Sequence, residues 1–345
     1  MDKWNNFKWG ELATLEYGKS LRDYHTQIEG VPVYGTNGKI GFTDKVLYEK
    51  PSVIIGRKGA YRGVHFSKTP FFVIDTAFYL KPKVKDIDPL FSYYQLKTVD
   101  IDSMDSGSAI PSTSREDFYD LDICLPSLKE QESIAEVLSS LDDKIDLLHR
   151  NNKTLEQLAE TLFRQWFVEE ADVSWEEGVL SDLFILQRGF DLPSQNRVEG
   201  NIPIITSGGI GQFHNQYKIK GPGIVTGRSG VLGNVFYVKD DFWPLNTTLF
   251  VSKFNRATTL FTYFFLKGID LNSLNAGSAV PTLNRNHVHG LKVNLPPLEL
   301  VNNFETKAES FFSKMYLNNL QIKQLESLRD TLLPKLMSGA VKVIN

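Results

Sequence analysis

The sequence GSAIP at residues 107–111 reappears as GSAVP at residues 277–281, 170 residues further along the chain. Arg115 follows the first copy, and Arg285 follows the second at the same distance. Because the chain has 345 residues, a repeat with this spacing accounts for nearly all of it. A protein built as two similar units on one chain is expected to contact two similar things at once.

The similarity extends well upstream of this loop, as expected for an internal duplication. There the offset is 171: Gly18 aligns with Gly189, and the motif Gly-Arg-x-Gly at residues 56–59 recurs at residues 227–230. The second copy therefore lacks one residue somewhere between about residues 76 and 107. We expect this difference in a surface loop, because loops tolerate changes in length.

The composition predicts a folded protein with more than one domain. A chain of 345 residues suggests two or three domains at about 150 residues each. A hydrophobic content of 41% is enough for packed cores. Cys124 is the only cysteine, so an internal disulfide is excluded and a reducing compartment is expected. With no signal peptide and no run of about 18 apolar residues, we expect a cytoplasmic protein.

Charge is distributed unevenly, although the formal net charge is only −3. Residues 31–68 hold seven Lys and Arg against two acids, and the aligned residues 202–239 hold four against none. Residues 126–170 hold ten acids and five bases. Each repeat thus carries a basic region at the same place, which fits nucleic-acid binding. The alternative is a pair of ordinary solvated faces.

The pattern changes at Pro126, where the sequence predicts a long helix. Residues 127–130 form a capping box, and no Gly or Pro follows until Gly178. Apolar residues then recur with a period of 3.5, as in a coiled coil. The second copy follows Pro297 with the same spacing, and we expect Pro334 to kink or loosen its last turn before a stop at residues 338–339. The seam positions are Ile134, Leu138, Leu141, Ile145, Leu148, Asn152, Leu155, Ala159, Leu162 and Trp166 in the first helix, and Phe304, Ala308, Phe311, Met315, Asn318, Ile322, Leu325, Arg329, Leu332 and Leu336 in the second.

These patterns predict an α+β fold with a pseudo-two-fold internal repeat. Two similar mixed α/β domains are separated by two long helices that form an antiparallel coiled coil. The predicted boundaries are residues 1–125 for the first domain, 126–170 for the first helix, 171–296 for the second domain, 297–338 for the second helix and 339–345 for a C-terminal tail. Within the domains, apolar runs at residues 52–56 and 224–227 predict buried strands.

Antiparallel pairing predicts a contact between Asn152 and Asn318 across the seam, with each side chain satisfying the amide of the other. A polar pair at this place would fix the register of the helices at some cost in stability. The alternative is that both asparagines turn toward solvent.

Motifs for catalysis are missing from the sequence. It contains neither a phosphate-binding loop of the GxxxxGK[ST] type nor a Gly-rich dinucleotide fingerprint. His287 and His289 have no third ligand nearby, so we expect no metal site. No pair of carboxylates recurs in both halves, which argues against an enzyme.

Recurring polar groups are the candidates for DNA contacts. Arginine binds phosphate bidentately or reads guanine, serine contacts phosphate or base edges, and glycine lets the backbone come close to a partner. The turns keep their glycines and arginines while other side chains differ, as expected for readers of two different sequences. The candidates are Lys19, Arg22, Lys39, Arg57, Lys58, Arg62, Ser108, Arg115, Arg188, Lys218, Lys220, Arg228, Ser278, Asn284, Arg285 and His287. The alternatives are salt bridges to local acids for the arginines, and helix caps or hairpins for the Gly-Ser loops.

Four phrases in this tandem arrangement are specific when taken together: GSAIP at residues 107–111, LPSLKEQESIA at 125–135, LFRQWF at 162–167 and LRDTLLPKL at 328–336. With them, the chain resembles over its full length the specificity subunit of type I restriction–modification enzymes. This resemblance implies two target-recognition domains that each read half of a split sequence in double-stranded DNA. It also implies paired helices that set the spacer and dock two methyltransferase subunits.

In such a complex the partners carry the chemistry. The resemblance implies adenine methylation by the methyltransferase subunits and restriction by motor–nuclease subunits, so that S-adenosylmethionine, Mg²⁺ and ATP belong to the partners and this chain needs no cofactor. Trp166, Phe167 and Phe312 are candidate anchors for the methyltransferases, or are buried against the domains. Two other functions stay open: a coiled-coil adaptor that binds only proteins, and a duplicated enzyme with an unrecognised site. The half-site sequences and the spacer length cannot be read from one chain.

Overall fold

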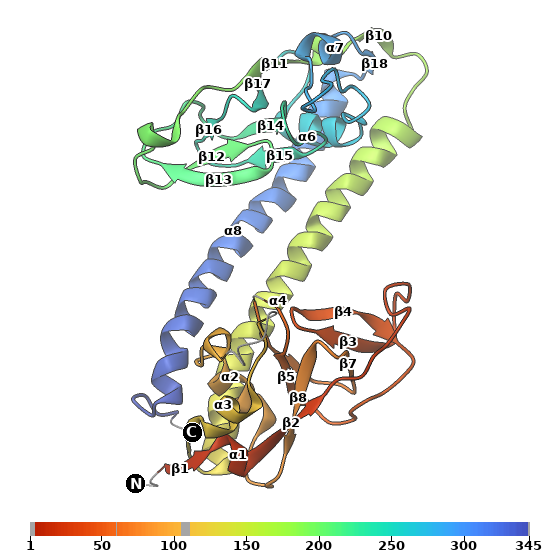
Figure 1. Ribbon diagram of the computed structural model, residues 1–345. Helices are drawn as coiled ribbons and strands as arrows, with labels where there is room; N and C mark the ends of the chain where they lie inside the picture. Colours follow the sequence, from red (N-terminus) through yellow and green to blue (C-terminus); the bar gives the residue numbers. More distant parts are fainter. Residues whose placement is uncertain (1–3, 60, 105–110, 344–345) are drawn as a thin grey trace. The chain divides into compact units, whose positions relative to one another are not determined.

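A computed structural model describes residues 4–59, 61–104 and 111–343 of the chain (Figure 1). The chain divides into two compact units. Unit 1 comprises Met1–Leu147 and Ile322–Asn345, and unit 2 comprises Leu148–Gln321. Each unit therefore combines one sheet-rich part with a portion of both long helices, α4 (Leu128–Arg164) and α8 (Leu298–Met337). In the described residues no helix is both long and apolar enough to cross a membrane.

Unit 1 contains three sheets. Its largest has the strand order β2-β8-β5-β6 with antiparallel neighbours, and a second has the order β4-β3-β7, in which β3 and β7 run parallel. The third pairs the first strand, β1, with β9, the strand that precedes α4. The strands are β1 (Asn5–Lys8), β2 (Ala13–Tyr17), β3 (Val31–Gly35), β4 (Gly38–Thr43), β5 (Ser52–Gly56), β6 (Val64–Ser67), β7 (Phe72–Val73), β8 (Ala77–Pro82) and β9 (Asp122–Leu125).

Unit 2 repeats this topology strand for strand. Its sheets have the orders β11-β17-β14-β15, β13-β12-β16 and β10-β18. The duplication predicted from the sequence is thus confirmed at the level of the fold, including the buried strands β5 and β14. The strands are β10 (Glu176–Val179), β11 (Phe184–Arg188), β12 (Ile202–Thr206), β13 (Gly209–His214), β14 (Gly223–Gly227), β15 (Val235–Val238), β16 (Trp243–Pro244), β17 (Thr248–Phe254) and β18 (Lys292–Leu295).

Short helices also correspond between the units. Asp88 caps α2 by accepting from the backbone N–H of Phe91, and Pro89 at the first helical position fixes the backbone there. The later helices α3 and α7 begin one residue after Ser114 and Asn284, whose side chains cap them. Unit 1 contains α1 (Trp9–Leu12), α2 (Pro89–Leu96), η1 (Ile101–Ser103) and α3 (Arg115–Asp120). Unit 2 contains α5 (Leu180–Leu183), η3 (Ser194–Asn196), α6 (Thr259–Lys267) and α7 (Arg285–His289).

The length difference between the repeats lies where a strand leads into a helix. Six residues connect β8 to α2, whereas four connect β17 to α6. The second repeat also gains one residue, because the pairing of β11 with β17 shifts between Ile185 and Leu186. Ser252 is the extra residue, a bulge in β17. A two-residue shortening and a one-residue bulge together give the single missing residue predicted from the sequence.

Two long helices follow the domains. α4 (Leu128–Arg164) begins directly after Ser127 and ends in a π-helical turn, η2 (Gln165–Glu169), rather than continuing as a regular helix through Trp166. α8 (Leu298–Met337) continues for three residues past Pro334. The predicted stop is confirmed, because Gly339 has a positive φ of 70° after the last turn.

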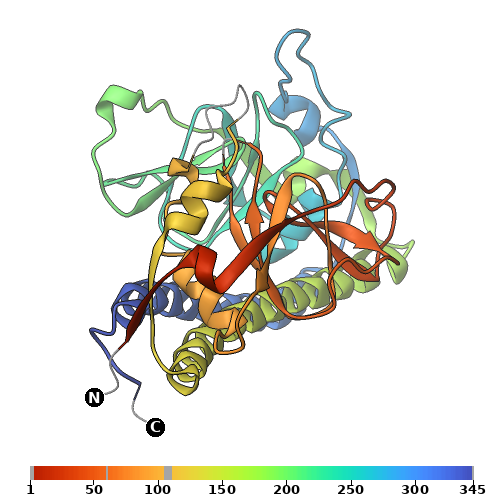
Figure 2. The same cartoon turned by 60° about the horizontal axis from the view of Figure 1, so that its bottom comes forward.

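The apolar stripe of each helix packs against its partner helix and against a domain. In unit 1 one core contains Phe91 and Phe118 of the domain, Leu138 of α4 and Leu336 of α8. Trp4, just before β1, packs against the same core, so the first strand and the end of α8 are neighbours in both views (Figures 1 and 2). The equivalent core of unit 2 contains Phe184, Phe261, Ala159 and Phe304. Each large side chain buried in this way contributes about 1.5–3 kcal/mol.

Polar residues interrupt the helix seam at one place in each unit. In unit 1 the Arg329 guanidinium on α8 lies 2.8 Å from the Asp142 carboxylate on α4, which also accepts a hydrogen bond of 2.6 Å from the Tyr94 hydroxyl. In unit 2 the two helices run antiparallel, since Asn152 contacts Asn318 while Phe163, further along α4, contacts Phe304, further back on α8.

Candidate nucleic-acid interface

The two motifs that revealed the duplication lie side by side in unit 1. The Gly-Arg-x-Gly turn follows β5, and the end of the Gly-Ser loop runs along it: the Gly59 N–H donates to the Pro111 carbonyl at 3.0 Å, and the Thr113 N–H donates to the Arg57 carbonyl at 2.9 Å. The Thr113 hydroxyl closes the contact on the Gly56 carbonyl at 2.8 Å. Residues about 50 positions apart in the sequence thus form one corner.

The two backbone hydrogen bonds recur in unit 2, where Leu283 takes the place of Thr113 and so makes no hydroxyl bond. The Gly230 N–H donates to the Pro281 carbonyl at 3.0 Å, and the Leu283 N–H donates to the Arg228 carbonyl at 2.8 Å. We call these two places the arginine corners. Agreement bond by bond between two copies of low identity shows that the backbone of the corner is the preserved feature.

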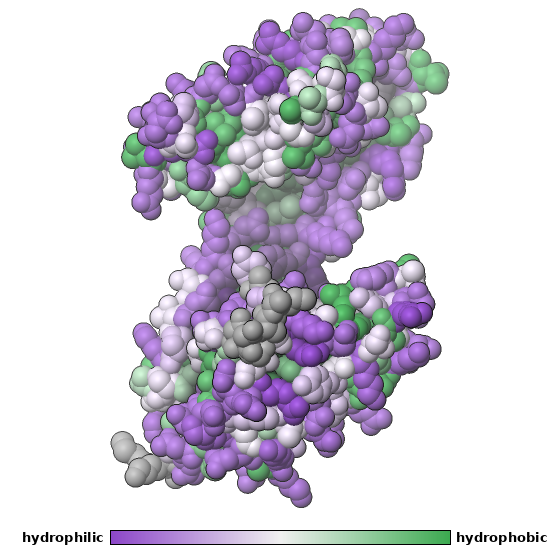
Figure 3. All heavy atoms as spheres, in the orientation of Figure 1, coloured by the Kyte–Doolittle hydropathy of each residue, from purple (hydrophilic) through white to green (hydrophobic). Residues whose placement is uncertain are grey.

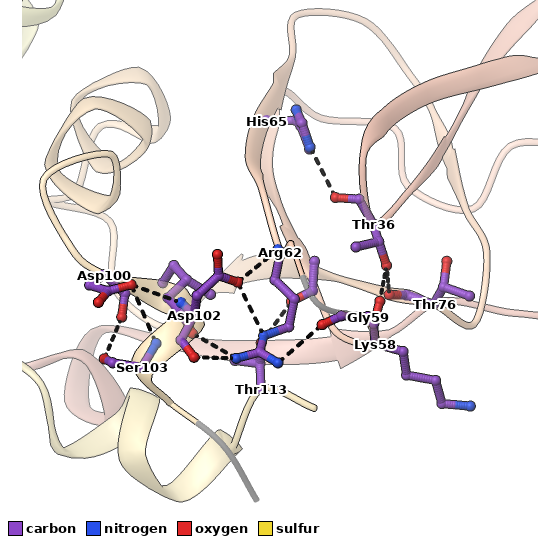
Figure 4. Close-up of polar contacts among 12 residues, drawn as sticks. Thr36, Lys58, Gly59, Arg62, His65, Thr76, Asp100, Asp102, Ser103 and Thr113 are labelled. Carbon is purple, nitrogen blue, oxygen red and sulfur yellow. Dashed lines mark hydrogen bonds and ion pairs between the residues drawn. The ribbon is translucent and has the colours of Figure 1, made fainter. Parts of the chain in front are cut away.

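A threonine carbonyl in each arginine corner accepts two backbone hydrogen bonds from the Gly-Arg turn. In unit 1 the Thr76 carbonyl accepts from the N–H groups of Arg57 and Lys58 at 2.9 and 3.1 Å. The Thr36 hydroxyl lies 2.6 Å from the same carbonyl and 2.8 Å from that of Lys58, and the Lys58 side chain extends away from this network (Figure 4). In unit 2 the Thr247 carbonyl makes the equivalent pair of bonds, to the N–H groups of Arg228 and Ser229.

In unit 1 two arginines contact the same aromatic ring at this corner. The guanidinium carbons of Arg57 and Arg115 lie 4.9 Å and 5.1 Å from the centre of the Tyr17 ring. Arg115 also donates a hydrogen bond of 2.8 Å to the Tyr119 hydroxyl. This hydrogen bond raises the pKa of the arginine, and a hydrogen bond to Tyr17 has a smaller effect in the same direction. Cation–π contacts and these hydrogen bonds offset the repulsion between the two charges.

Unit 2 builds the equivalent corner without the ring. Arg188 occupies the place of Tyr17, and Arg228 donates to the Asn246 carbonyl at 2.9 Å, as Arg57 does to the Asp75 carbonyl at 2.8 Å. Burial lowers the pKa of Arg228, and the neighbouring charge of Arg188 lowers it further. The carboxylate of Asp191, 3.4 Å from Arg188, acts in the opposite direction and raises the pKa of Arg228.

The strand that leads into each corner is held by a side chain from a short helix. In unit 1 the Leu15 N–H donates to the Tyr119 hydroxyl at 3.1 Å. In unit 2 the Leu186 N–H donates to Nε2 of His289 at 2.9 Å, and burial followed by the charge of Arg285 lowers the pKa of this histidine. His289 thus supports the fold as a neutral imidazole. The described residues contain no group of three His, Cys, Asp or Glu side chains able to hold a metal ion.

A family model for the "Type I restriction modification DNA specificity domain" matches the chain twice, at residues 1–157 and 172–326. The chain belongs to this family.

Similar proteins include other specificity subunits. The chain is 23% identical over 390 residues to the type I restriction enzyme MjaIX specificity subunit of Methanocaldococcus jannaschii, covering 97% of this chain and 88% of that subunit. It is 29% identical over 139 residues to the HindI specificity subunit of Haemophilus influenzae, covering 38% of this chain and 30% of that one. The crystal structure of a type I S subunit from M. genitalium shares the fold, with a TM-score of 0.71 and 22% identity over 97% of this chain and 96% of that chain. Specificity subunits are the non-catalytic components of these systems.

The predicted contact residues of this specificity subunit fall into groups. Those at the exposed surface are Lys19, Arg22, Lys39, Arg188, Lys218, Lys220, Ser278, Asn284, Arg285 and His287, whereas Arg57, Lys58, Arg115 and Arg228 are half-buried in the arginine corners. Lys39 and Lys218 also lie over aromatic rings, 3.8 Å from the centre of Phe42 and 5.0 Å from that of Trp243. The face of unit 1 seen in Figure 3 is mainly hydrophilic. Ser108 lies outside the described residues.

Arg62 requires a correction, because its side chain is only 2% exposed. It lies inside the first domain, where its guanidinium donates to the backbone carbonyls of Gly59 and Asp102 at 3.2 and 2.6 Å and approaches the Asp102 carboxylate at 3.6 Å (Figure 4). Arg62 therefore ties the Gly-Arg turn to the short helix η1 and has no free surface for DNA. For Arg62 the alternative role considered for the arginines, a salt bridge to a local acid, is the one that the structure shows.

Phe312 also differs from the prediction of a partner anchor. It is 7% exposed and packs against the rings of Tyr237, at 5.0 Å, and Phe264, at 5.9 Å. Trp166 and Phe167 lie in the π-helical turn and are half-buried; the Phe167 ring contacts Phe261 at 4.9 Å. All three aromatics thus stabilise unit 2 itself, and only the latter two keep some exposed surface.

Sequence reasoning missed Tyr17, Thr36 and Tyr119 in the first arginine corner. The available signal was that Tyr17 directly precedes the repeated Gly18. The residue aligned with Tyr17 in the second repeat is an arginine, so a search for identical residues did not select this position. Thr36 and Tyr119 align with Ser207 and His289, so the search for identical residues did not select these positions either.

Proposed function

We propose that this specificity subunit binds double-stranded DNA through its two arginine corners, one for each half of a split target. The observation that carries the proposal is the repeated corner itself, in which the same backbone bonds hold Arg57 in unit 1 and Arg228 in unit 2. Arg115 and Arg285 each follow two residues after the residue that donates to this arginine carbonyl. None of these four arginines forms an ion pair with a carboxylate of the described residues. Unpaired arginines at a glycine-rich corner suit phosphates and base edges.

Affinity and specificity then have different sources. Exposed lysines such as Lys19, Lys39 and Lys218 supply phosphate contacts, which make binding depend steeply on salt. Base-edge contacts at each corner add about 1–3 kcal/mol apiece. One reader alone binds weakly, whereas two readers on one chain gain effective concentration when the half-sites have the right spacing.

The helices α4 and α8 serve as the spacer ruler in this proposal and dock two methyltransferase subunits. Restriction and translocation subunits join that complex. Adenine methylation and cleavage, with S-adenosylmethionine, Mg²⁺ and ATP, belong to these partners and not to this chain. We place the complex in the cytoplasm, together with the DNA that it binds.

Mapping methylated adenines in DNA from cells that carry the complete system tests the proposal. We expect a single split motif with a fixed spacer. Inserting one heptad into both α4 and α8 should lengthen or shorten the spacer and leave both half-sites unchanged. Methylation without a split motif would contradict the two-reader proposal, and an unchanged spacer after the insertion would contradict the ruler. An adaptor that binds only proteins would give a complex without DNA affinity.

A further inference from the structure

The residue that lies next to the repeated arginine differs between the two corners. Tyr17 is the last residue of β2, and Arg188 is the last residue of β11. Each precedes a glycine whose N–H donates to an equivalent carbonyl: Gly18 to Ala77 at 3.1 Å and Gly189 to Thr248 at 3.0 Å. The two side chains therefore start from the same point on the same backbone scaffold.

Both side chains reach solvent beside a repeated arginine. Tyr17 is 49% exposed while its ring faces Arg57 and Arg115. The Arg188 side chain is 51% exposed, and its Nη2 lies 3.4 Å from a carboxylate oxygen of Asp191, which occupies the position of Ser20 in the first repeat. Asp191 also accepts a hydrogen bond from the Asn246 side chain, which orients its carboxylate beside Arg188.

The pattern of repetition separates two kinds of DNA contact. The sugar–phosphate backbone is the same in every DNA sequence, so side chains that bind it suit both half-sites and can be repeated. Base edges differ between half-sites, so side chains that read them must differ as well. Arg57 and Arg115 recur as Arg228 and Arg285, whereas Tyr17 is replaced by Arg188 at the equivalent position.

We propose that Tyr17 and Arg188 are equivalent specificity-determining residues, flanked by arginines that hold the DNA backbone. This inference rests on the proposed function and adds the residue that distinguishes the two readers. The Arg188 guanidinium presents a planar fork of donors that pairs with O6 and N7 of a guanine in the second half-site. Tyr17 offers one hydroxyl and an apolar ring edge and cannot make this bidentate pair, so the first half-site has another base at the equivalent place.

Substitution at the two positions tests the proposal in the complete system, with methylated adenines mapped for each variant. Arg188→Lys keeps the charge and loses the fork, so phosphate binding survives while guanine recognition does not. Arg188→Tyr installs the residue of the first repeat. The reverse exchange, Tyr17→Arg with Ser20→Asp, transfers the Arg188–Asp191 pair onto the first corner, where Tyr17→Phe is the matched control that keeps the ring.

We expect Arg188→Lys to lower the preference for guanine at one position of the second half-site by roughly ten-fold or more, with the first half-site unchanged. The unchanged half-site reports that the variant is folded. The Tyr17→Arg/Ser20→Asp variant should gain a guanine in the first half-site, and the second half-site should stay the same.

Two results would overturn the inference while leaving the two-reader function intact. One is an Arg188→Lys variant with the wild-type motif. The other is an Arg188→Tyr variant that methylates all sites less but with the same sequence preference, as expected for a phosphate contact. Failure of the function itself would look different, because the wild-type system would then give no split motif.

Discussion

The side-chain amide of Asn318 on α8 donates a hydrogen bond of 2.8 Å to the side-chain oxygen of Asn152 on α4. Asn318 is 1% exposed, so this is a buried polar contact in the helix seam of unit 2. The predicted pairing is confirmed, but the reciprocity is not: the Asn152 amide donates to the neighbouring Asn319 instead, at 2.8 Å. Polar groups buried in a coiled coil specify register, because only one alignment satisfies them.

Replacing Asn318 should therefore destabilise unit 2. Asn318→Leu leaves the Asn152 oxygen without its partner, which costs about 1–3 kcal/mol in the free energy of unfolding measured with urea. The double variant Asn152→Leu/Asn318→Leu should recover most of this loss, because two apolar side chains pack together and leave no polar group without a partner. Asn303→Ala, at an exposed position of the same helix, is the control and should change stability little. Equal destabilisation by all three variants would show that the pair is not coupled.

Gly18 and Gly189 should tolerate no side chain. A Cβ at Gly18 would lie 1.9 Å from the Ile74 carbonyl oxygen, and one at Gly189 would lie 2.1 Å from that of Leu245, so the backbone beside the arginine corner would have to move. Either substitution by alanine should lower stability by about 1–3 kcal/mol in urea unfolding. Gly268→Ala, where the nearest contacts are at 3.5 Å or more, is the control and should be close to neutral. A destabilising Gly268→Ala with a neutral Gly18→Ala would contradict this account of the corner.

Arg62 and Lys58, four residues apart, should respond oppositely in two assays. Arg62→Met removes the donors that hold the Gly59 and Asp102 carbonyls and should cost about 1–3 kcal/mol of stability. Lys58→Ala should leave stability unchanged and reduce the slope of log binding constant against log salt concentration by about 1, as for one lost phosphate contact. The two measurements are chemical unfolding and DNA binding of the assembled complex across a salt series. A salt slope altered only by the Arg62 variant would reverse their assigned roles.

His289 should make unit 2 less stable in acid. Burial, followed by the charge of Arg285, lowers its pKa below the ordinary value of 6.5, and the neutral ring accepts a hydrogen bond from the Leu186 N–H. Its contribution is therefore fully present above pH 6.5 and is lost as the pH falls through the folded pKa. His289→Tyr, which copies Tyr119 of the first repeat, should weaken this dependence when unfolding is compared at pH 7.5 and 5.5. His289→Phe lacks the acceptor and should be less stable at both pH values. An identical pH dependence in wild type and His289→Tyr would argue against this role.

The repeat and the helices could be predicted because their signals are local and periodic. Spacing of 3.5 residues identified the seam of α4 and α8, and the capping sequence at Ser127 located the start of the first helix to the residue. The duplication followed from glycines and arginines in one register. The sequence could not show that the Asn152 amide turns to Asn319, because neighbouring asparagines on one helix are equivalent until the rotation of the helix is known.

Side-chain burial limited the prediction of the site. Arg57 and Arg62 have the same chemistry and lie in the same basic stretch, and only the fold decides that Arg62 points inward to Asp102. Tyr17 was missed for a related reason, since a search for repeated residues favours groups that bind the shared DNA backbone and overlooks those that distinguish two sequences. The same limit applies to Phe312, whose spacing on α8 did not show that a domain covers it.

The account is tested most directly by disabling one arginine corner at a time in the complete system and mapping methylated adenines. Arg57 and Arg115 hold the first corner on the DNA backbone, so replacing both by alanine releases the base-reading side chain of that corner and should relax or abolish recognition of the first half-site only. Arg228→Ala with Arg285→Ala should do the same for the second half-site only. Loss of both half-sites together in each folded variant, or an unchanged split motif in both, would contradict the claim that each corner reads its own half of the target.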